Sequence, residues 1–391
     1  MVDHVASGGD GVLQDGRDLV YVAGAFVGDR VRVERRGANA TLLEVLSAGP
    51  ERREPSCDAV GTCGGCPWMA WDYPHQRAHK KALVERCVGR EVELVGSDDL
   101  GYRRRAFLSF RQGSLGFLRD RSDRVVDRKA CVVLAAPLQH ALTALRKRLL
   151  PKLKGRGEIG LARSLDRAVA TIRTVEAQPP EAYEACRALL DDGFAGLALT
   201  WEGAAPAVFG DPVERTLGAD GEVLVGTLGG FSQAHDVRND ELVRRVVDWA
   251  KPEGAHVLEL HAGHGNLGVM LARGSSSYVG VEIDPEAVRS LASNLQARGL
   301  SGKAVVADAA AYPKGSYDVV VLDPPRRGAA EVIPRLVQER PERIVYVSCA
   351  PTALQRDLAP LLEAGYAVDE ACAFDLFPQT PHVETVVRLH R

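Results

Sequence analysis

Strands and helices alternate regularly from residue 256 to the end of the chain, and this alternation restricts the fold more than any other feature. Short buried strands are predicted in "HVLEL", "YVGVEID", "KAVVADA", "YDVVVL" and "RIVYVS", with turns and helices between them. Two further strands are predicted near 366–374 and 383–390. Strands and helices that alternate at this spacing predict an α/β domain with a doubly wound, Rossmann-like sheet.

Acidic residues follow three of these strands and indicate the ligand. Glu282, Asp308 and Asp323 end the second, third and fourth strands, where a nucleoside ligand of such a sheet binds. The first strand runs into the turn "HAGHGN", in which Asn266 stands near the third glycine position of a dinucleotide motif, and no P-loop is present. The pattern favours S-adenosylmethionine, which has no pyrophosphate, over NAD or ATP.

Two residues in the same region suit methylation of a pyrimidine carbon. Cys349 ends the fifth strand, and Glu384 begins the last one. A thiolate that adds to C6 of uracil makes C5 nucleophilic, and a carboxylate can then remove the C5 proton. A small buried cysteine and an exposed strand-end charge are the ordinary interpretations of these two residues.

A second cluster lies far upstream. Cys57, Cys63 and Cys66 fall within ten positions, and their Gly-Gly spacer permits a tight loop. Cys131 follows a predicted hairpin that can return to this loop as a fourth ligand, whereas Cys87 has the position of a core residue on a helix over residues 74–88. Four thiolates hold zinc or an iron–sulfur cluster, and the asymmetric spacing favours a [4Fe–4S] cluster.

Charge is unevenly distributed, although the whole chain carries only −3. Residues 101–131 hold nine basic and three acidic residues with four interleaved aromatic residues, a composition typical of a nucleic-acid surface. We expect three domains: a small OB-like barrel over 1–50, an α+β domain over 51–225 and the S-adenosylmethionine-binding domain over 226–391. The helix near 74–88 can pack either within the α+β domain or on the S-adenosylmethionine-binding domain.

No apolar run reaches the ~20 residues of a membrane helix, and the N-terminus lacks the pattern of a secretory signal. We therefore expect a cytoplasmic protein that binds no membrane. In that compartment, thiols stay reduced, so the eight cysteines predict metal binding or catalysis and not disulfides.

The motifs together resemble the RNA 5-methyluridine methyltransferases, in particular the iron–sulfur branch that acts on 23S ribosomal RNA. The resemblance rests on "GGDGV", the cysteine run, "GYRRRAFLSFR", "GFSQAH", "LELHAGHGN", "LDPPRRG", "VSCAPTAL" and "HVET". It implies a TRAM barrel at the N-terminus, Cys349 as nucleophile, Glu384 as base, and an RNA substrate for a monomer that does not act on DNA. It also implies four [4Fe–4S] ligands, which are Cys57, Cys63, Cys66 and Cys131. The residues that it implies around the cofactor and target base are Gln233, His261, Asn266, Glu282, Asp308 and Asp323.

Three positions depart from the family pattern. Ala350 replaces an asparagine after the nucleophile, His261 replaces an aromatic residue, and His235 replaces an asparagine. The alternatives are therefore an RNA 5-methylcytosine methyltransferase, a transfer RNA 5-methyluridine methyltransferase, or an inactive iron–sulfur RNA-binding relative.

Overall fold

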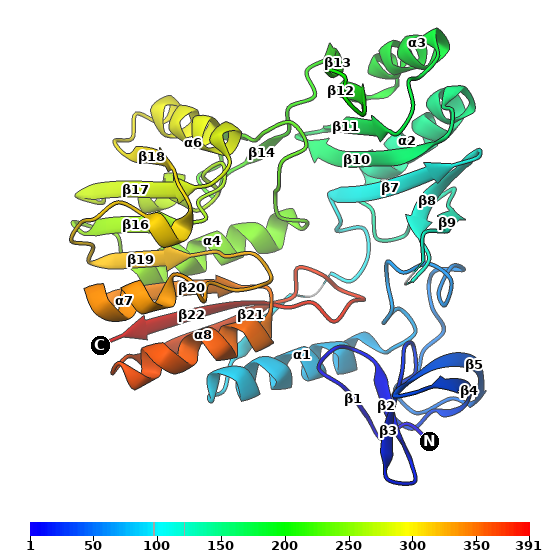
Figure 1. Cartoon of the computed structure of the whole chain (residues 1–391), viewed down its shortest axis with the longest axis horizontal. Coiled ribbons are helices and arrows are strands. Elements are labelled where there is room, and N and C mark those ends of the chain that lie inside the picture. Colours follow the sequence, from blue (N-terminus) through cyan, green and yellow to red (C-terminus); the bar gives the residue numbers. More distant parts are fainter. Residues whose placement is uncertain (97, 121) are drawn as a thin grey trace.

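A computed structural model describes residues 1–96, 98–120 and 122–391. Three sheets dominate it, one from each third of the chain in rough order (Figure 1). Within the described ranges, no helix is both long and apolar enough to cross a membrane.

The N-terminal sheet has five short strands in the order β1-β2-β3-β5-β4. Tight turns at Gly16 and Gly37, both with positive φ, connect its hairpins. Val20, Val22 and Ala25 form its small core, and β3 pairs in parallel with β5. The strands are β1 (His4–Val5), β2 (Gly11–Asp15), β3 (Asp18–Val22), β4 (Arg30–Arg36) and β5 (Asn39–Ser47).

The central sheet has seven strands in the order β13-β12-β11-β10-β7-β8-β9, with α2 and α3 packed on one side. The predicted hairpin is present: Gln112 and Gly113, both at positive φ, form the two-residue turn between β7 and β8. The elements are β7 (Arg105–Arg111), β8 (Ser114–Leu118), β9 (Val125–Asp127), α2 (Ala136–Ala144), β10 (Arg156–Ser164), β11 (Arg167–Thr174), α3 (Pro180–Ala188), β12 (Phe194–Trp201) and β13 (Ala207–Gly210). Short turns of π and 3-10 helix, η1 (Leu145–Leu149), η2 (Leu150–Lys152) and η3 (Leu189–Asp192), extend α2 and α3.

The C-terminal sheet is the predicted Rossmann-like sheet, with eight strands in the order β18-β17-β16-β19-β20-β22-β21-β6. Strands β16 to β20 are parallel, and β22 runs antiparallel beside β20. Before this sheet, β14 (Arg215–Leu217) and β15 (Val223–Val225) form a separate two-stranded sheet. The elements that follow are α4 (Asp236–Ala250), β16 (His256–Leu260), α5 (Gly268–Leu271), β17 (Ser277–Glu282), α6 (Pro285–Ala297), β18 (Lys303–Val306), η4 (Ala309–Ala311), β19 (Val319–Leu322), α7 (Ile333–Glu339), β20 (Arg343–Ser348), α8 (Pro351–Glu363), β21 (Ala367–Phe374) and β22 (Glu384–His390).

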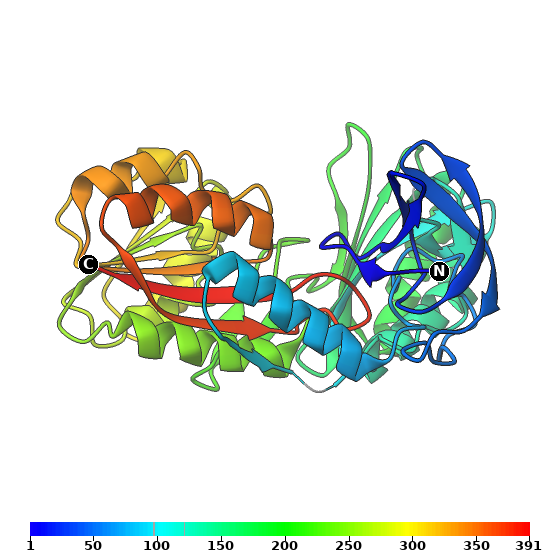
Figure 2. The same ribbon diagram turned by 90° about the horizontal axis from the view of Figure 1, so that it is seen from below.

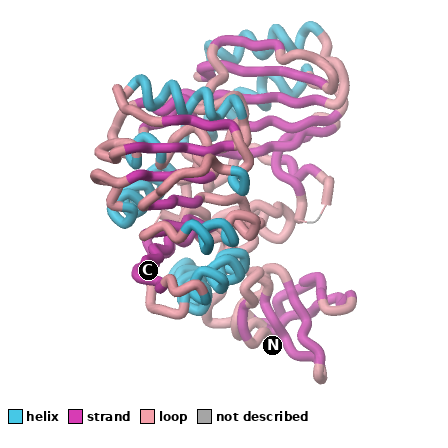
Figure 3. The backbone as a smooth tube through the Cα atoms, turned by 60° about the vertical axis from the view of Figure 1, so that its left-hand side comes forward, coloured by secondary structure: helices cyan, strands magenta, loops and turns pink. Residues whose placement is uncertain are grey.

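Helices cover both faces of this sheet, as Figure 3 shows from another side. On one face, α4 and α6 contribute Leu242 and Leu291 to a core that also holds Val345. On the other face, α7 and α8 contribute Ile333 and Leu354. The strands between them are buried on both sides, which explains their continuous apolar sequences.

Residues far upstream complete this layer. Helix α1 (Tyr73–Val88) packs against α8 and β21, and β6 (Glu93–Val95) adds a parallel strand beside β21 at the sheet edge. Figure 2 shows α1 running alongside β21 and β22. The helix begins with Pro74 in its first turn and ends at Gly89, which has a φ of 72°. Residues 73–95 therefore belong to the C-terminal layer in space, a placement that the sequence left open for the helix and did not predict for β6.

Candidate active site

The carboxyl ends of β16, β17, β19 and β20 meet at one edge of the C-terminal sheet. The strand order reverses between β16 and β19, and ligands of open α/β sheets bind at such a switch point. Glu282 ends β17, while Asp323 and Cys349 directly follow β19 and β20. The structure thus brings residues from four separate stretches of sequence to one edge.

The glycine turn after β16 is tied to the end of β17. The backbone N–H of Gly263 donates to Glu282 Oε2 at 3.0 Å, and those of Ile283 and Asp284 donate to Oε1 at 2.8 and 3.0 Å. Gly265 has a φ of 98°, and a Cβ there would lie 2.8 Å from Leu291 Cδ1. The turn therefore needs glycine at 265, and Glu282 is held in one orientation with capacity left on Oε2 for a hydroxyl donor.

Gln233 and His261 carry buried polar atoms without a partner. Gln233 is 7% exposed, and neither its Oε1 nor His261 Nε2 has a hydrogen-bond partner among the described residues. His261 also has a φ of 62°, an uncommon conformation for a residue other than glycine. Burial lowers the pKa of His261, and nearby Glu282 opposes that shift. Buried polar groups are nearly always satisfied in proteins, so these two atoms are suited to a bound ligand.

Asn266 and Asp308 are bound to their own surroundings. Asn266 exchanges two hydrogen bonds with Asn239 of α4, at 3.0 and 2.8 Å, which ties the glycine turn to that helix. Asp308 is exposed and caps η4, because its Oδ1 accepts from the N–H of Ala310 at 2.8 Å. Asp308 therefore shapes the loop at the end of β18 and keeps one oxygen uncommitted in that contact.

Cys349 and Glu384 lie at the ends of two paired strands. Ser348 of β20 pairs with Thr385 of β22, so the next residue on each strand is Cys349 or Glu384. Cys349 is half-buried, whereas Glu384 is only 4% exposed. Burial, followed by the charges of Glu384 and Asp323, raises the pKa of the Cys349 thiol to about 11.

The two carboxyl groups of this cluster also hold their protons more tightly than usual. Burial and then the charge of Asp323 raise the pKa of Glu384 to about 8, while Arg326 opposes the shift. Burial raises the pKa of Asp323 to about 7. Both groups titrate near neutral pH, which is the range in which a general base works best.

His382 lies near Glu384 in sequence but is engaged elsewhere. A guanidinium nitrogen of Arg326 lies 3.2 Å from His382 Nε2, and the ring of Phe377 meets the imidazole edge to face at 6.0 Å. Burial and then Arg326 lower the pKa of His382 to about 4, so the imidazole is neutral. Its Nε2 lone pair is occupied by the Arg326 donor, which makes Glu384 the better base.

The other two departures from the family pattern, His235 and Ala350, have different surroundings. His235, which is 4% exposed, stacks on Tyr102 with ring centroids 5.2 Å apart and planes at 20°. Ala350 precedes α8, and its backbone N–H donates to Ser348 Oγ at 3.2 Å. The Ala350 methyl group offers no polar atom beside Cys349.

All four predicted metal ligands line one cavity. Cys57, Cys63, Cys66 and Cys131 share it with Arg103, Phe117, Arg128 and Val132. Burial and then the neighbouring Cys131 raise the pKa of Cys66 to about 12. Cys87 lies apart on α1, where its thiol donates to the Pro351 carbonyl at 3.0 Å. Across the described residues, no set of three or more His, Cys, Asp or Glu side chains converges closely enough for one metal ion.

The basic segment is only partly a surface. Arg104 is 4% exposed, and it pairs with Glu214 at 2.6 Å and Asp236 at 2.8 Å. Arg105 lies 3.2 Å from Ser232 Oγ and is also enclosed. Arg104 therefore does not belong to the nucleic-acid surface that we expected over residues 101–131, because it forms internal ion pairs. The exposed members are Arg111, Arg119, Arg124 and Lys129, while Arg121 lies outside the described residues.

Sequence reasoning missed Arg326, although it stands in the quoted "LDPPRRG". It also missed the loop between β21 and β22, whose buried glutamine, Gln379, has no signature that distinguishes it from a surface residue. Gln379 is distinguished from a surface residue only by its 0% exposure and by its hydrogen-bond partners from distant segments.

Comparisons with known proteins agree with this geometry. Residues 308–391 match the family described as tRNA (Uracil-5-)-methyltransferase, and residues 228–345 match the methyltransferase small domain. The chain is 33% identical to a 23S rRNA (uracil(1939)-C(5))-methyltransferase of Chromohalobacter salexigens, over 100% of this chain and 88% of that protein. It is 31% identical to the enzyme of the same name from Klebsiella pneumoniae, over 98% and 93%.

Among solved structures, the chain resembles a tRNA (uracil-54, C5)-methyltransferase of Pyrococcus abyssi in complex with S-adenosyl-L-homocysteine. The TM-score is 0.81 at 25% identity, and the match covers 99% of each chain. The likeness therefore extends over all three sheets and not only the Rossmann-like one.

Proposed function

Because the chain belongs to the RNA (uracil-C5-)-methyltransferase family, we propose that it methylates C5 of a uridine in 23S ribosomal RNA with S-adenosylmethionine as donor. The observation that carries the proposal is the position of Cys349 and Glu384, side by side at the ends of β20 and β22. Their strand ends lie at the same edge of the sheet as the glycine turn and Glu282, where a nucleoside cofactor would lie. Cys349 is the nucleophile, and Glu384 is the base.

Cys349 and Glu384 each carry out one part of the reaction. Cys349 adds as a thiolate to C6 of the uracil, which makes C5 nucleophilic. Bound S-adenosylmethionine would supply the electrophilic methyl group and leave as S-adenosyl-L-homocysteine. After C5 has gained the methyl group, Glu384 removes the C5 proton, and the S–C6 bond breaks to release 5-methyluridine and the Cys349 thiolate.

The residues around the turn fit the cofactor. Glu282 is oriented by three backbone N–H groups and can accept from ribose hydroxyls. The partnerless Gln233 Oε1 and His261 Nε2 are available to a polar ligand. Asn266 holds the turn against α4. We assign Asp308, which follows β18, to the adenine and Asp323, which follows β19, to the target base.

Two surfaces support an RNA substrate. The N-terminal strands have the order β1-β2-β3-β5-β4 of a small OB-like barrel, which we assign as a TRAM-type RNA-binding domain. A groove of about 870 Å³ lies between these strands, α1 and the start of α8, and Tyr21, His79, Arg86 and Pro351 line it. Pro351, which lines the groove, is two residues from Cys349 in sequence. Exposed Phe107 on β7 offers a further stacking surface.

The four-cysteine cavity fits a [4Fe–4S] cluster better than a zinc ion. A single zinc ion needs four ligands at about 2.3 Å from one atom, and no described set converges in that way. A cluster binds its four thiolates through separate iron atoms, so the ligands lie farther apart. Cys57, Cys63, Cys66 and Cys131 line one cavity and supply four thiolates. We assign the cluster a structural role in a cytoplasmic, monomeric enzyme.

Transfer RNA is the second candidate substrate. The family match over residues 308–391 and the Pyrococcus abyssi structure both carry a transfer RNA name. The 23S rRNA relatives are 33% and 31% identical to the chain, against 25% for the Pyrococcus abyssi protein. We therefore rank ribosomal RNA first.

The test is methyl transfer from labelled S-adenosylmethionine to unmodified 23S rRNA and, separately, to unmodified transfer RNA, followed by nucleoside analysis. The proposal predicts label in 5-methyluridine from 23S rRNA, lost in Cys349→Ala. Label in 5-methylcytidine would contradict the reaction, and label only in transfer RNA would correct the substrate. No label from either RNA would support an inactive relative, in line with Ala350.

A further inference from the structure

The loop that joins β21 to β22 carries the chain to Glu384, and its central residue is unusual. Gln379 is 0% exposed and has a φ of 67°, a conformation that costs a residue with a side chain some backbone strain. Such strain persists where surrounding contacts hold the residue in place. The contacts of Gln379 account for it.

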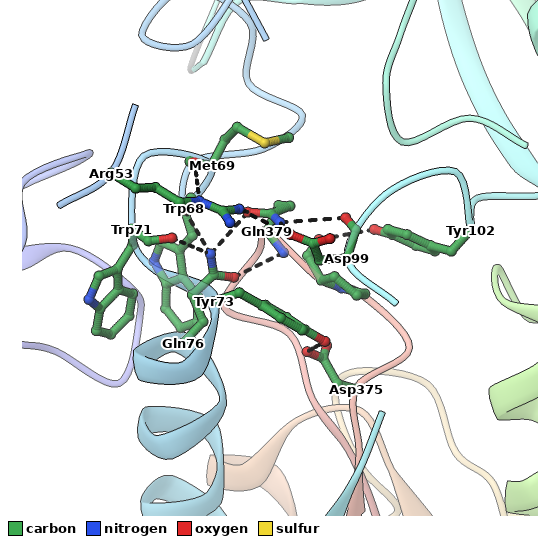
Figure 4. A network of polar contacts seen from close by, with 11 residues as sticks. Arg53, Trp68, Met69, Trp71, Tyr73, Gln76, Asp99, Tyr102, Asp375 and Gln379 are labelled. Carbon is green, nitrogen blue, oxygen red and sulfur yellow. Dashed lines mark hydrogen bonds and ion pairs between the residues drawn. The ribbon is translucent and has the colours of Figure 1, made fainter. Parts of the chain in front are cut away.

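Every polar group of Gln379 is bound (Figure 4). Its backbone N–H donates to Gln76 Oε1 at 3.1 Å, and its carbonyl accepts from the Trp68 N–H at 3.0 Å. Its Oε1 accepts from Gln76 Nε2 at 2.9 Å and from Arg53 Nη2 at 3.2 Å. Its Nε2 donates to Asp99 Oδ2 at 3.0 Å. Arg53, Gln76 and Asp99, which lie 326, 303 and 280 residues upstream, thus converge on this one side chain.

Three residues on one face of α1 form hydrogen bonds with the loop between β21 and β22. Tyr73, Gln76 and Lys80 follow the i, i+3, i+7 spacing of a single helix face. Tyr73 Oη and Lys80 Nζ bind the two carboxylate oxygens of Asp375, at 3.0 and 2.6 Å. Lys80 Nζ also donates to the Phe377 carbonyl at 3.0 Å. The loop is therefore fixed from its first residue to Gln379.

The cysteine-bearing loop is the other support. Trp68, whose N–H binds the Gln379 carbonyl, stands two residues after Cys66. Tyr102 Oη donates to the Pro378 carbonyl at 3.0 Å, and Tyr102 contacts the same core as Cys66 and Cys131. The folded cysteine loop and the loop before Glu384 therefore share direct hydrogen bonds.

We infer that Gln379 is a positioning residue for Glu384, which joins α1 and the cysteine loop to the loop that aims the base at the C5 proton. The inference rests on the proposed function, because it assigns Gln379 to the proton-removal step alone. Cys349 is carried by β20 and not by this loop, so thiol addition and methyl transfer are independent of Gln379. A residue needed only for folding would not separate these steps.

Gln379→Gly is the direct test, because glycine keeps the positive φ without strain and removes only the side-chain bonds. We expect adduct formation and first-turnover methyl transfer at the wild-type rate, with product release slowed about 10- to 100-fold by the displaced base. A methylated protein–RNA species should therefore accumulate. Gln76→Ala, which changes α1 and leaves the loop sequence intact, should give the same species. In that variant the backbone N–H of Gln379 also loses its acceptor and should exchange hydrogen faster.

Gln178→Gly is the matched control. Gln178 is a buried glutamine of the central domain that binds Lys154 backbone atoms at 2.9 and 3.2 Å. Its loss should lower stability without trapping RNA. The inference would be overturned if Gln379→Gly and Gln76→Ala released product at the wild-type rate. It would also be overturned if Gln178→Gly trapped the protein–RNA species equally. Neither result would contradict the proposed function. If Glu384→Gln itself forms no adduct, the proposed function fails, and the inference fails with it.

Discussion

Cys349 and Glu384 continue the same strand pair, one residue beyond the contact between Ser348 of β20 and Thr385 of β22. The proposed nucleophile and base thereby follow backbone hydrogen bonds of a sheet that is buried on both faces. Two reacting groups on rigid elements need little reorganisation during catalysis, which is the main benefit of such placement. The predictions below test how charge, packing and the remote loops support this pair.

The rate of proton removal should rise with pH through the range near pH 8, because the base must be a carboxylate and the pKa of Glu384 lies at about 8. Arg326 holds that pKa down, so Arg326→Gln should move the rising part of the pH–rate profile to higher pH. Arg327→Gln is the control, since Arg327 is exposed and pairs with Glu331 at 3.0 Å. The measurement is the rate of product release in a single turnover as a function of pH. An unchanged profile in Arg326→Gln would show that Arg326 does not affect the pKa of Glu384.

The ion pair of Lys80 and Asp375 has both side chains fully buried, 2.6 Å apart. Lys80→Met should cost about 3–5 kcal/mol of the free energy of unfolding, because Asp375 is left as an uncompensated buried charge. The double variant Lys80→Met/Asp375→Asn should recover much of that loss. Denaturant unfolding measures both, and a double variant no more stable than the single one would show that the pairing is not the source.

The purified protein should be brown and contain iron if the four-cysteine cavity holds a [4Fe–4S] cluster. Cys131→Ser should lose the absorbance near ~400 nm that thiolate-bound clusters give. Cys87→Ser should keep it, since Cys87 instead bonds the Pro351 carbonyl. Metal analysis provides the test that could contradict this assignment. One zinc per chain without iron would show that the cavity is a zinc site and not a cluster site.

RNA binding should depend on the exposed arginines of the central sheet and not on the enclosed ones. Arg119→Gln and Arg124→Gln should each lower the slope of log affinity against log salt by about one unit or less. Both residues are exposed, whereas Arg104 is internally paired. Binding titrations at several salt concentrations test this, with exposed Arg187→Gln on α3 as control; slopes equal to wild type would make these arginines an ordinary solvated surface.

The Rossmann-like sheet was predictable because buried parallel strands leave continuous apolar runs, such as those around Val320 and Val345, and each ends in a polar residue. Cys349 and Glu384 could be proposed for the same reason, since a strand end fixes their position. The hairpin turn at Gln112 and Gly113 also has a local signal. These features depend on neighbours in sequence.

The remaining features depend on contacts across long sequence separations. The pairing of β6 with β21 joins Glu93 to Cys372, and three residues of strand carry too little pattern to predict such a partner. Arg104 resembles a surface cation until Glu214 and Asp236 are placed beside it. Gln379 likewise acquires its role only from partners that the sequence does not bring near.

The most direct test of the account is denaturing electrophoresis and mass analysis of Glu384→Gln after reaction with RNA and labelled S-adenosylmethionine. The thiolate should add and the methyl group should transfer, but the C5 proton then has no acceptor. A covalent species in which Cys349 is bonded to RNA that carries the labelled methyl group should accumulate, and Cys349→Ala in the same protein should abolish it. Turnover of Glu384→Gln at the wild-type rate without a trapped species would contradict the assignment of Glu384 as the base.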